Sequence, residues 1–92
     1  MAKMTEEMIE AMDHEFTFVP HHIRGGIKNY IENKIPLGGF LSSMLRNDLE
    51  GTLNKADGTN QKHIYSIYRW FYNYAPAPCM QYDEWIHEWM RD

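Results

Sequence analysis

The chain has 92 residues, a net charge of −4, and a composition that is 43% hydrophobic and 24% charged. A chain of this length supports one hydrophobic core, and this hydrophobic share excludes an intrinsically disordered protein. Three Trp, six Tyr, four Phe and seven Met are a high content of aromatic residues and methionine for so short a chain. This content needs a structural or a functional explanation.

Charge and cysteine usage narrow the class of protein. The nine basic residues are scattered along the chain among thirteen acidic ones. Nucleic-acid binding is therefore disfavoured, because proteins that bind a phosphate backbone usually concentrate Lys and Arg in a patch.

The single cysteine, Cys79, excludes an intramolecular disulfide and a multi-thiolate zinc site. Residues 1–12 do not resemble a signal peptide, and no apolar run approaches the ~20 residues that span a bilayer. We expect a soluble cytoplasmic protein with no membrane partner.

The N-terminal third predicts two helices joined by an extended segment. Thr5 suits the N-cap of a short helix near residues 5–13, and acidic residues follow it in the first turn. Residues 15–19 are predicted to be an extended linker. Pro20 suits the first turn of a second helix, whose apolar residues recur at helical spacing until Pro36 ends it. The pattern allows residues 1–17 to be a peripheral helix and linker.

Two adjacent glycines, Gly25 and Gly26, lie inside this second predicted helix. Each costs a helix about 1 kcal/mol relative to Ala. Either another helix approaches closely at this point, or the glycines leave room for a ligand or a partner's backbone. We favour close helix packing.

The next segment predicts a third amphipathic helix, which runs to about residue 47. Asn47 and Asp48 either continue this helix or cap a short successor. The apolar residues of that successor would be Leu49, Leu53 and Ala56.

The C-terminal third carries the most strongly patterned helix, over about residues 60–74. Thr59 or Asn60 is its expected N-cap, and the Ala-Pro repeat over 75–78 ends it. A last helix is predicted to begin near Tyr82 or Asp83. The whole pattern predicts an all-α fold, a compact bundle of four to six short helices in a single domain over residues 1–92.

The apolar arc of the helix at 60–74 is about twice what a surface helix of a small monomer can bury, so this helix either is central to the domain or presents aromatic residues to a partner. At 100° per residue, its core stripe is formed by Ile64, Ile67, Tyr68 and Phe71. Tyr65 and Tyr72 then lie on one flank, and Trp70 and Tyr74 on the other. Tyr and Trp are enriched at interface hot spots, so we predict that Tyr65, Trp70, Tyr72 and Tyr74 contact a partner. Burial of these side chains in the core is the alternative.

Sequence motifs for catalysis and metal binding are absent. His14, Glu15, His21 and His22 cluster, but no H-E-x-x-H or Cys/His spacing accompanies them. No Ser or Cys has a recognisable nucleophile motif, and no phosphate-binding glycine pattern occurs. Cys79 is expected to be a small buried hydrophobic residue. We therefore expect no enzymatic activity, no cofactor and no metal.

Three sequence blocks resemble a group of small orphan proteins encoded by tailed phages and prophages. The first block is Ile35-Pro36-x-Gly38-x-Phe40-Leu41 with Leu45 and Asn47-Asp48-Leu49, the second is Ala56-Asp57 with Asn60, and the third is Tyr72-Asn73-x-Ala75-Pro76-x-x-Cys79 with Trp85. The resemblance covers roughly residues 18–92. The resemblance transfers no catalytic residue. It implies a viral accessory role, and analogy extends this role to binding host machinery such as a CRISPR or another defence complex.

The leading functional hypothesis is a non-enzymatic phage protein that binds and inhibits a host protein complex. One alternative is an accessory of phage DNA metabolism that stacks single-stranded nucleic acid or a nucleotide on the same aromatic residues. Another alternative is a structural homodimer whose exposed aromatic residues pair with themselves.

Overall fold

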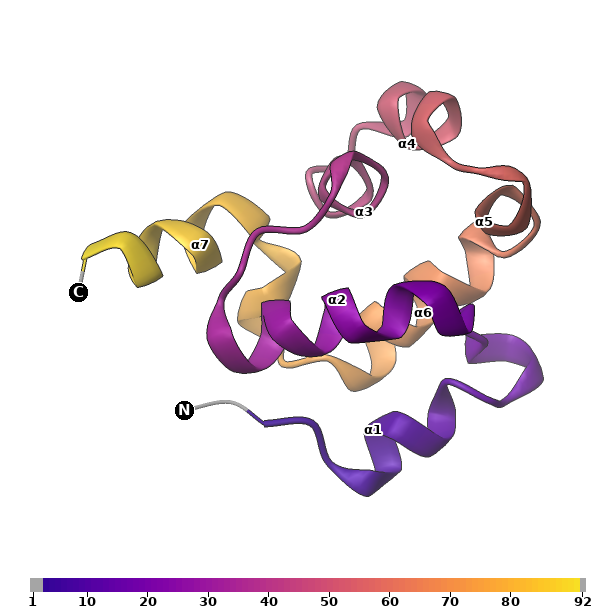
Figure 1. Ribbon diagram of the computed structural model, residues 1–92, viewed down its shortest axis with the longest axis horizontal. Coiled ribbons are helices and arrows are strands. Elements are labelled where there is room, and N and C mark those ends of the chain that lie inside the picture. Colours follow the sequence, from indigo (N-terminus) through magenta and orange to yellow (C-terminus); the bar gives the residue numbers. More distant parts are fainter. Residues whose placement is uncertain (1–2, 92) are drawn as a thin grey trace.

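The computed structural model describes the backbone of residues 3–91 and the side chains of residues 3–86. Within this range the chain forms seven α-helices and two short 3-10 turns, with no β-strand (Figure 1). The all-α prediction is confirmed. The helices are α1 (Glu6–Ala11), α2 (His21–Asn33), α3 (Gly39–Leu45), α4 (Leu49–Lys55), α5 (Gly58–Lys62), α6 (Ile64–Tyr74) and α7 (Tyr82–Arg91), and the 3-10 turns are η1 (Glu15–Thr17) and η2 (Ala77–Met80).

Side-chain caps decide where three of the short helices begin. Thr5 begins α1, Asp48 begins α4 and Asp57 begins α5, each by accepting a hydrogen bond from a first-turn backbone N–H. Of the two predictions for Asn47 and Asp48, the second is confirmed: Asp48 caps a separate short helix, so residues 39–55 form two helices rather than one. At α5 the predicted caps Thr59 and Asn60 are wrong, because the N-cap is Asp57, two or three residues earlier.

The predicted helix over 60–74 is divided at His63. The backbone of His63 has φ −123° and ψ 16°, so α5 ends before it and α6 begins after it. The ring of His63 packs against Phe18, with 4.8 Å between ring centroids, and the Ser66 hydroxyl donates to the Phe18 carbonyl at 2.8 Å. This division and the separate α4 raise the number of helices above the predicted four to six.

The predicted extended segment over 15–19 is extended only in part. The turn η1 occupies its first three residues, and the hydroxyl of Thr17 donates to the carbonyl of Ala11. Phe18 and Val19 then lead to α2, with Pro20 as the N-cap residue.

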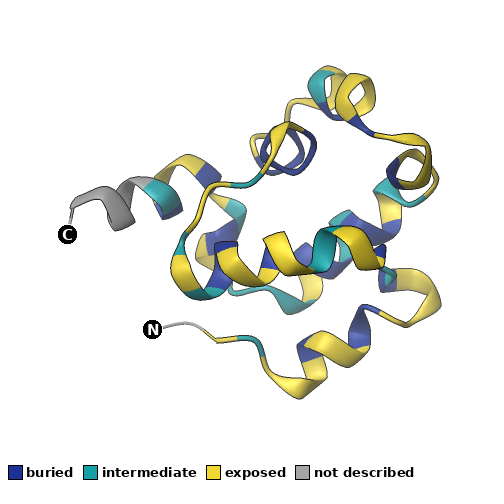
Figure 2. Cartoon of the chain, in the orientation of Figure 1, coloured by how far each residue is buried: buried dark blue, intermediate teal, exposed yellow. Residues whose placement is uncertain are grey.

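The N-terminal helix is part of the core, which corrects the suggestion that residues 1–17 are peripheral. Met8 and Met12 are buried members of the core cluster. Figure 2 shows buried stretches of ribbon in α1. The indole N–H of Trp70 donates to the Met8 carbonyl at 2.8 Å, and the guanidinium of Arg24 donates to the Met12 carbonyl at 2.9 Å. Carbonyls at a helix C-terminus lack intrahelical donors, so these two side chains fix α1 against α6 and α2.

The glycine pair in α2 does not make a close helix contact, so the favoured interpretation is wrong. A Cβ atom built on Gly25 or Gly26 would meet no heavy atom within 4 Å. The buried face of α2 is formed instead by Ile27, Tyr30 and Ile31. The glycines therefore lie beside open space.

No packing reason opposes alanine at these positions, so we expect Gly25→Ala to raise the free energy of unfolding by about 0.5–1 kcal/mol. Gly26→Ala should do the same. Urea unfolding followed by circular dichroism measures the change. Gly51→Ala is the matched control in another helix and should destabilise, because a Cβ there would collide with the Asp48 carboxylate that caps α4. Loss of stability in Gly25→Ala would contradict the open environment.

Candidate functional site

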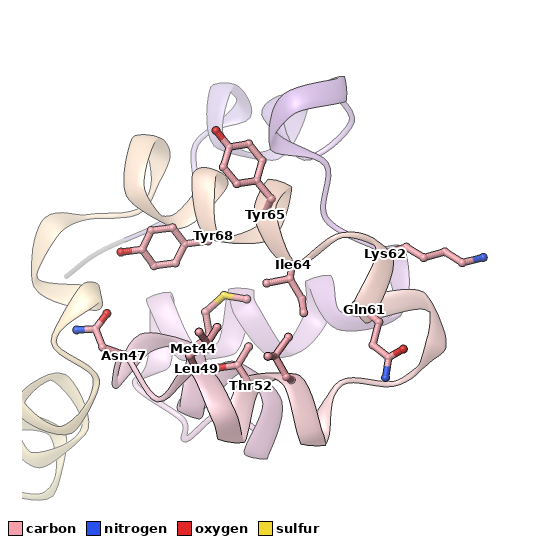
Figure 3. Close-up of a pocket in the computed structure, with 10 residues that line it drawn as sticks. Met44, Asn47, Leu49, Thr52, Gln61, Lys62, Ile64, Tyr65 and Tyr68 are labelled. Atoms are coloured by element: carbon pink, nitrogen blue, oxygen red, sulfur yellow. The ribbon is translucent and has the colours of Figure 1, made fainter.

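An apolar groove lies between the α3–α4 hairpin on one side and α5 and α6 on the other (Figure 3). Its volume is about 580 Å³. Met44 and Ile64 face one another across it in Figure 3. Its apolar walls are formed by Met44, Leu49, Leu53, Ile64, Tyr65 and Tyr68.

The α4 wall of the groove exposes two leucines. The Thr52 hydroxyl donates to the Asp48 carbonyl at 2.7 Å, and Thr52 is buried. Leu49 and Leu53, one helical turn apart, are 68% and 50% exposed. Fully burying a leucine side chain contributes about 1.5–3 kcal/mol. A partner that covers this wall therefore gains apolar contact without displacing any part of the fold.

The α6 wall of the groove continues into an ordered tyrosine surface. Tyr65 is 68% exposed, and the Arg69 guanidinium lies over its ring and donates to its hydroxyl at 2.9 Å. Tyr72 is 71% exposed and stacks on Tyr68, which lines the groove, with 6.4 Å between ring centroids. We call the groove together with Tyr72 the α4–α6 surface. Its tyrosine rings are held in place before any partner arrives, which lowers the entropy cost of binding.

The structure separates the four predicted contact residues. Tyr65 and Tyr72 lie together on the α4–α6 surface. Tyr74 is half-buried against the core cluster, away from the groove lining. Trp70 is 0% exposed, so its prediction as a contact residue is wrong. Its indole packs edge-on against Phe71, and its N–H donates to the carbonyl of Met8 in α1, so α1 covers this flank of α6.

Leu49 and Leu53 are the residues that the sequence did not identify as part of a site. Their i, i+4 spacing predicts an apolar helix face, and an apolar face is usually buried. The length of α4 could have indicated their exposure. A seven-residue helix has few residues with which to pack against the core, so it cannot also bury these two leucines.

Charge at the groove differs in sign from the charge of the whole chain. Among the residues that the structure describes, Lys62 lines the groove and no carboxylate does. The Lys62 side chain extends beyond one end of the groove (Figure 3). Arg69 adds a second cation beside Tyr65. The local field therefore favours a partner that carries negative charge next to its apolar residues.

The histidine cluster does not converge on one point. His22 Nε2 lies 3.0 Å from Asp57 Oδ2 and links α2 to the start of α5. The backbone N–H of Asn60, followed by the His22 side chain, lowers the pKa of Asp57. In the described part of the chain, no group of three His, Cys, Asp or Glu side chains is arranged to hold a metal ion.

Cys79 is fully buried in η2, as the sequence predicts. Burial raises the pKa of its thiol from 9.0 to about 12. Burial also raises the pKa of Tyr30, whose hydroxyl donates to the Cys79 carbonyl. Both groups therefore stay protonated in the folded chain under alkaline conditions that ionise them in the unfolded chain.

This difference predicts a loss of stability at alkaline pH. Above about pH 9 the unfolded thiol releases a proton that the folded one keeps until its pKa of about 12, so stability falls as pH rises. The expected loss between pH 8 and pH 10 is about 1 kcal/mol. Urea midpoints across this range measure it, and Cys79→Ala should flatten the decline. An unchanged decline in that variant would assign the effect to other groups.

The two aromatic environments of α6 predict opposite mutational effects. Trp70→Phe removes the indole N–H and leaves the Met8 carbonyl without its buried donor, so we expect a cost of about 1–3 kcal/mol. Tyr72→Ala should change stability by no more than about 0.5 kcal/mol. Thermal and urea unfolding of both variants test this. Equal costs would show that α1 does not cover Trp70.

No helix in the part of the chain that the structure describes has the length and apolar character needed to cross a bilayer. Comparison of the chain with protein-family models, with curated proteins and with solved structures finds no match.

Proposed function

We propose that this protein is a non-enzymatic binding module that docks an amphipathic helix of another protein on the α4–α6 surface. The observation that carries the proposal is the groove itself, in which the exposed Leu49 and Leu53 lie across from the α6 wall. A groove between helical walls is the arrangement that takes apolar side chains from positions i, i+4 and i+7 of a third helix.

The partner helix carries a carboxylate next to its apolar residues. Lys62 supplies a cation at one end of the groove, and Arg69 supplies another beside Tyr65. A carboxylate at the matching end of the partner helix fixes its direction, because charged rim contacts set orientation and encounter rate more than they add affinity.

The resemblance to phage accessory proteins supplies the biological setting of the proposal. In that setting the partner is a host protein complex, such as a defence complex, and occupation of its helix inhibits it. Binding is sufficient for this role, and no step of it requires catalysis by the phage protein.

Capture from a bacterial host lysate tests the proposal with matched variants. The groove variant combines Leu49→Ser, Leu53→Ser and Tyr65→Ser, whereas the control combines Ile9→Ser, Phe16→Ser and Ile35→Ser at exposed apolar residues outside the groove. We expect one stoichiometric protein to be retained by the wild type and the control and lost by the groove variant. A photo-crosslinker at position 53 should react within an amphipathic helix of that protein. Equal retention by both variants would overturn the proposal.

Two solution measurements separate the alternatives. Light scattering should show a monomer, since a concentration-dependent dimer lost in the groove variant would assign the groove to a second copy of the chain. Single-stranded DNA should not quench tyrosine fluorescence at low salt. Salt-dependent quenching would favour stacking of nucleic acid on Tyr65 and Tyr72 instead.

A further inference from the structure

The two ends of the groove in the α4–α6 surface differ in their chemistry. Asn47 and Lys62 both line the groove, and Figure 3 shows them at opposite ends of it. Both residues are exposed. The other polar residues of the lining, Thr52 and Gln61, already donate to backbone carbonyls within the chain, at 2.7 Å and 3.2 Å. The polar groups open to the ends of a docked helix are therefore those of Asn47 and Lys62.

Lys62 makes one end of the groove cationic. None of the ion pairs found among the described side chains uses Lys62, and an ammonium group has three donors and no acceptor. The last turn of a helix has partial negative charge and carbonyls without intrahelical donors, whereas the first turn has partial positive charge and N–H groups without acceptors. Lys62 therefore favours the last turn of a docked helix and disfavours its first turn.

The second cation of the surface does not select a direction. The Arg69 guanidinium lies over the ring of Tyr65, and Figure 3 shows Tyr65 between Asn47 and Lys62. A charge between the two ends of the groove attracts a carboxylate on a docked helix whichever way that helix runs.

Asn47 provides an acceptor at the other end of the groove. Its backbone is left-handed, with φ 63°, and its backbone N–H donates to the Met44 carbonyl at 3.1 Å. Its side-chain amide has no hydrogen bond to any residue that the structure describes. Asparagine is a preferred N-cap residue because its side-chain oxygen accepts from a first-turn backbone N–H. Asn47 Oδ1 is suited to accept such an N–H from a docked helix.

The charges next to Asn47 favour the same direction. Asp48 and Glu50 follow it at the start of α4, and both are exposed. Arg46 precedes it, but a carboxylate of α7 neutralises that guanidinium at 2.7 Å. The groove therefore has acidic side chains beside its Asn47 end and a cation at its Lys62 end. These signs are complementary to the dipole of a helix that begins at Asn47 and ends at Lys62.

We infer that the groove binds its partner helix in one direction, with the first turn at Asn47 and the last turn at Lys62. The direction rests on the proposed function, because it concerns the helix that the α4–α6 surface docks. The partner helix then has apolar residues at i, i+4 and i+7 and an acidic residue in its last turn. Acidic residues are usually enriched in the first turn of a helix, so this feature distinguishes the partner from amphipathic helices in general.

Paramagnetic NMR of the full chain with a model helix tests the direction. The probe is a hydrocarbon-stapled, acetylated and amidated peptide of about 15 residues, with leucines at i, i+4 and i+7 and a glutamate in its last turn. We expect saturable shifts at Leu49 and Leu53. A nitroxide on the first turn of the peptide should broaden the Asn47 side-chain amide, and a nitroxide on the last turn should broaden the Lys62 amide.

The outcomes separate the direction from the proposed function. Shifts in the groove with equal or reversed broadening would overturn the direction and leave helix docking standing. No saturable shift in the groove up to about 1 mM peptide would overturn both.

A second probe, with the glutamate moved to the first turn, provides the matched comparison. The staple keeps both peptides helical, and we expect the second probe to bind at least about threefold more weakly. Lys62→Glu should reverse this preference, whereas Lys28→Glu, the same change of charge at an exposed residue outside the groove, should preserve it within about twofold. Asn47→Gly keeps the left-handed backbone and should weaken binding of the first probe about threefold. Equal affinities of the wild type for the two probes would overturn the direction.

Discussion

The fold depends on finding donors for the backbone carbonyls at the ends of its short helices. Helices of five to thirteen residues leave a large share of their carbonyls without an intrahelical partner. Buried aromatic side chains supply some of the missing donors. Trp70 donates to the Met8 carbonyl at 2.8 Å, and the Tyr30 hydroxyl donates to the Cys79 carbonyl. Trp85 adds a second donor, at 2.8 Å, to the Tyr30 carbonyl, which also accepts from the Lys34 backbone N–H at 3.0 Å. Much of the aromatic content therefore has a structural role that aliphatic residues of similar size would not fill.

This requirement also explains which parts of the fold the sequence predicts. Periodicity, caps and prolines are local, so they predict the helical class and the buried stripe of α6 that contains Phe71. The same helical periodicity does not distinguish the flank with Trp70 from the flank with Tyr72, so it predicts the same exposure for both. α1 covers the flank with Trp70 because the Trp70 indole contacts Met8, which lies 62 positions earlier in the chain. The break at His63 likewise accompanies packing against Phe18, from a distant part of the chain.

The candidate site was predicted only in part, for a related reason. The tyrosines of α6 stand out in the sequence, but Leu49 and Leu53 complete the groove only when the α3–α4 hairpin faces α6.

The long reach of the aromatic hydrogen bonds sets the order of events during synthesis. A ribosome adds about 5–20 residues per second, whereas a short helix forms within about a microsecond. Met8 and Trp70 are separated by 62 residues, and Tyr30 and Trp85 by 55. Trp70 and Trp85, which donate to carbonyls of the first two helices, are therefore synthesised several seconds after those helices, and Met8 and Met12 stay uncovered during that interval. Exposure of the nascent chain to aggregation or to chaperones is thus governed by translation speed rather than by helix formation.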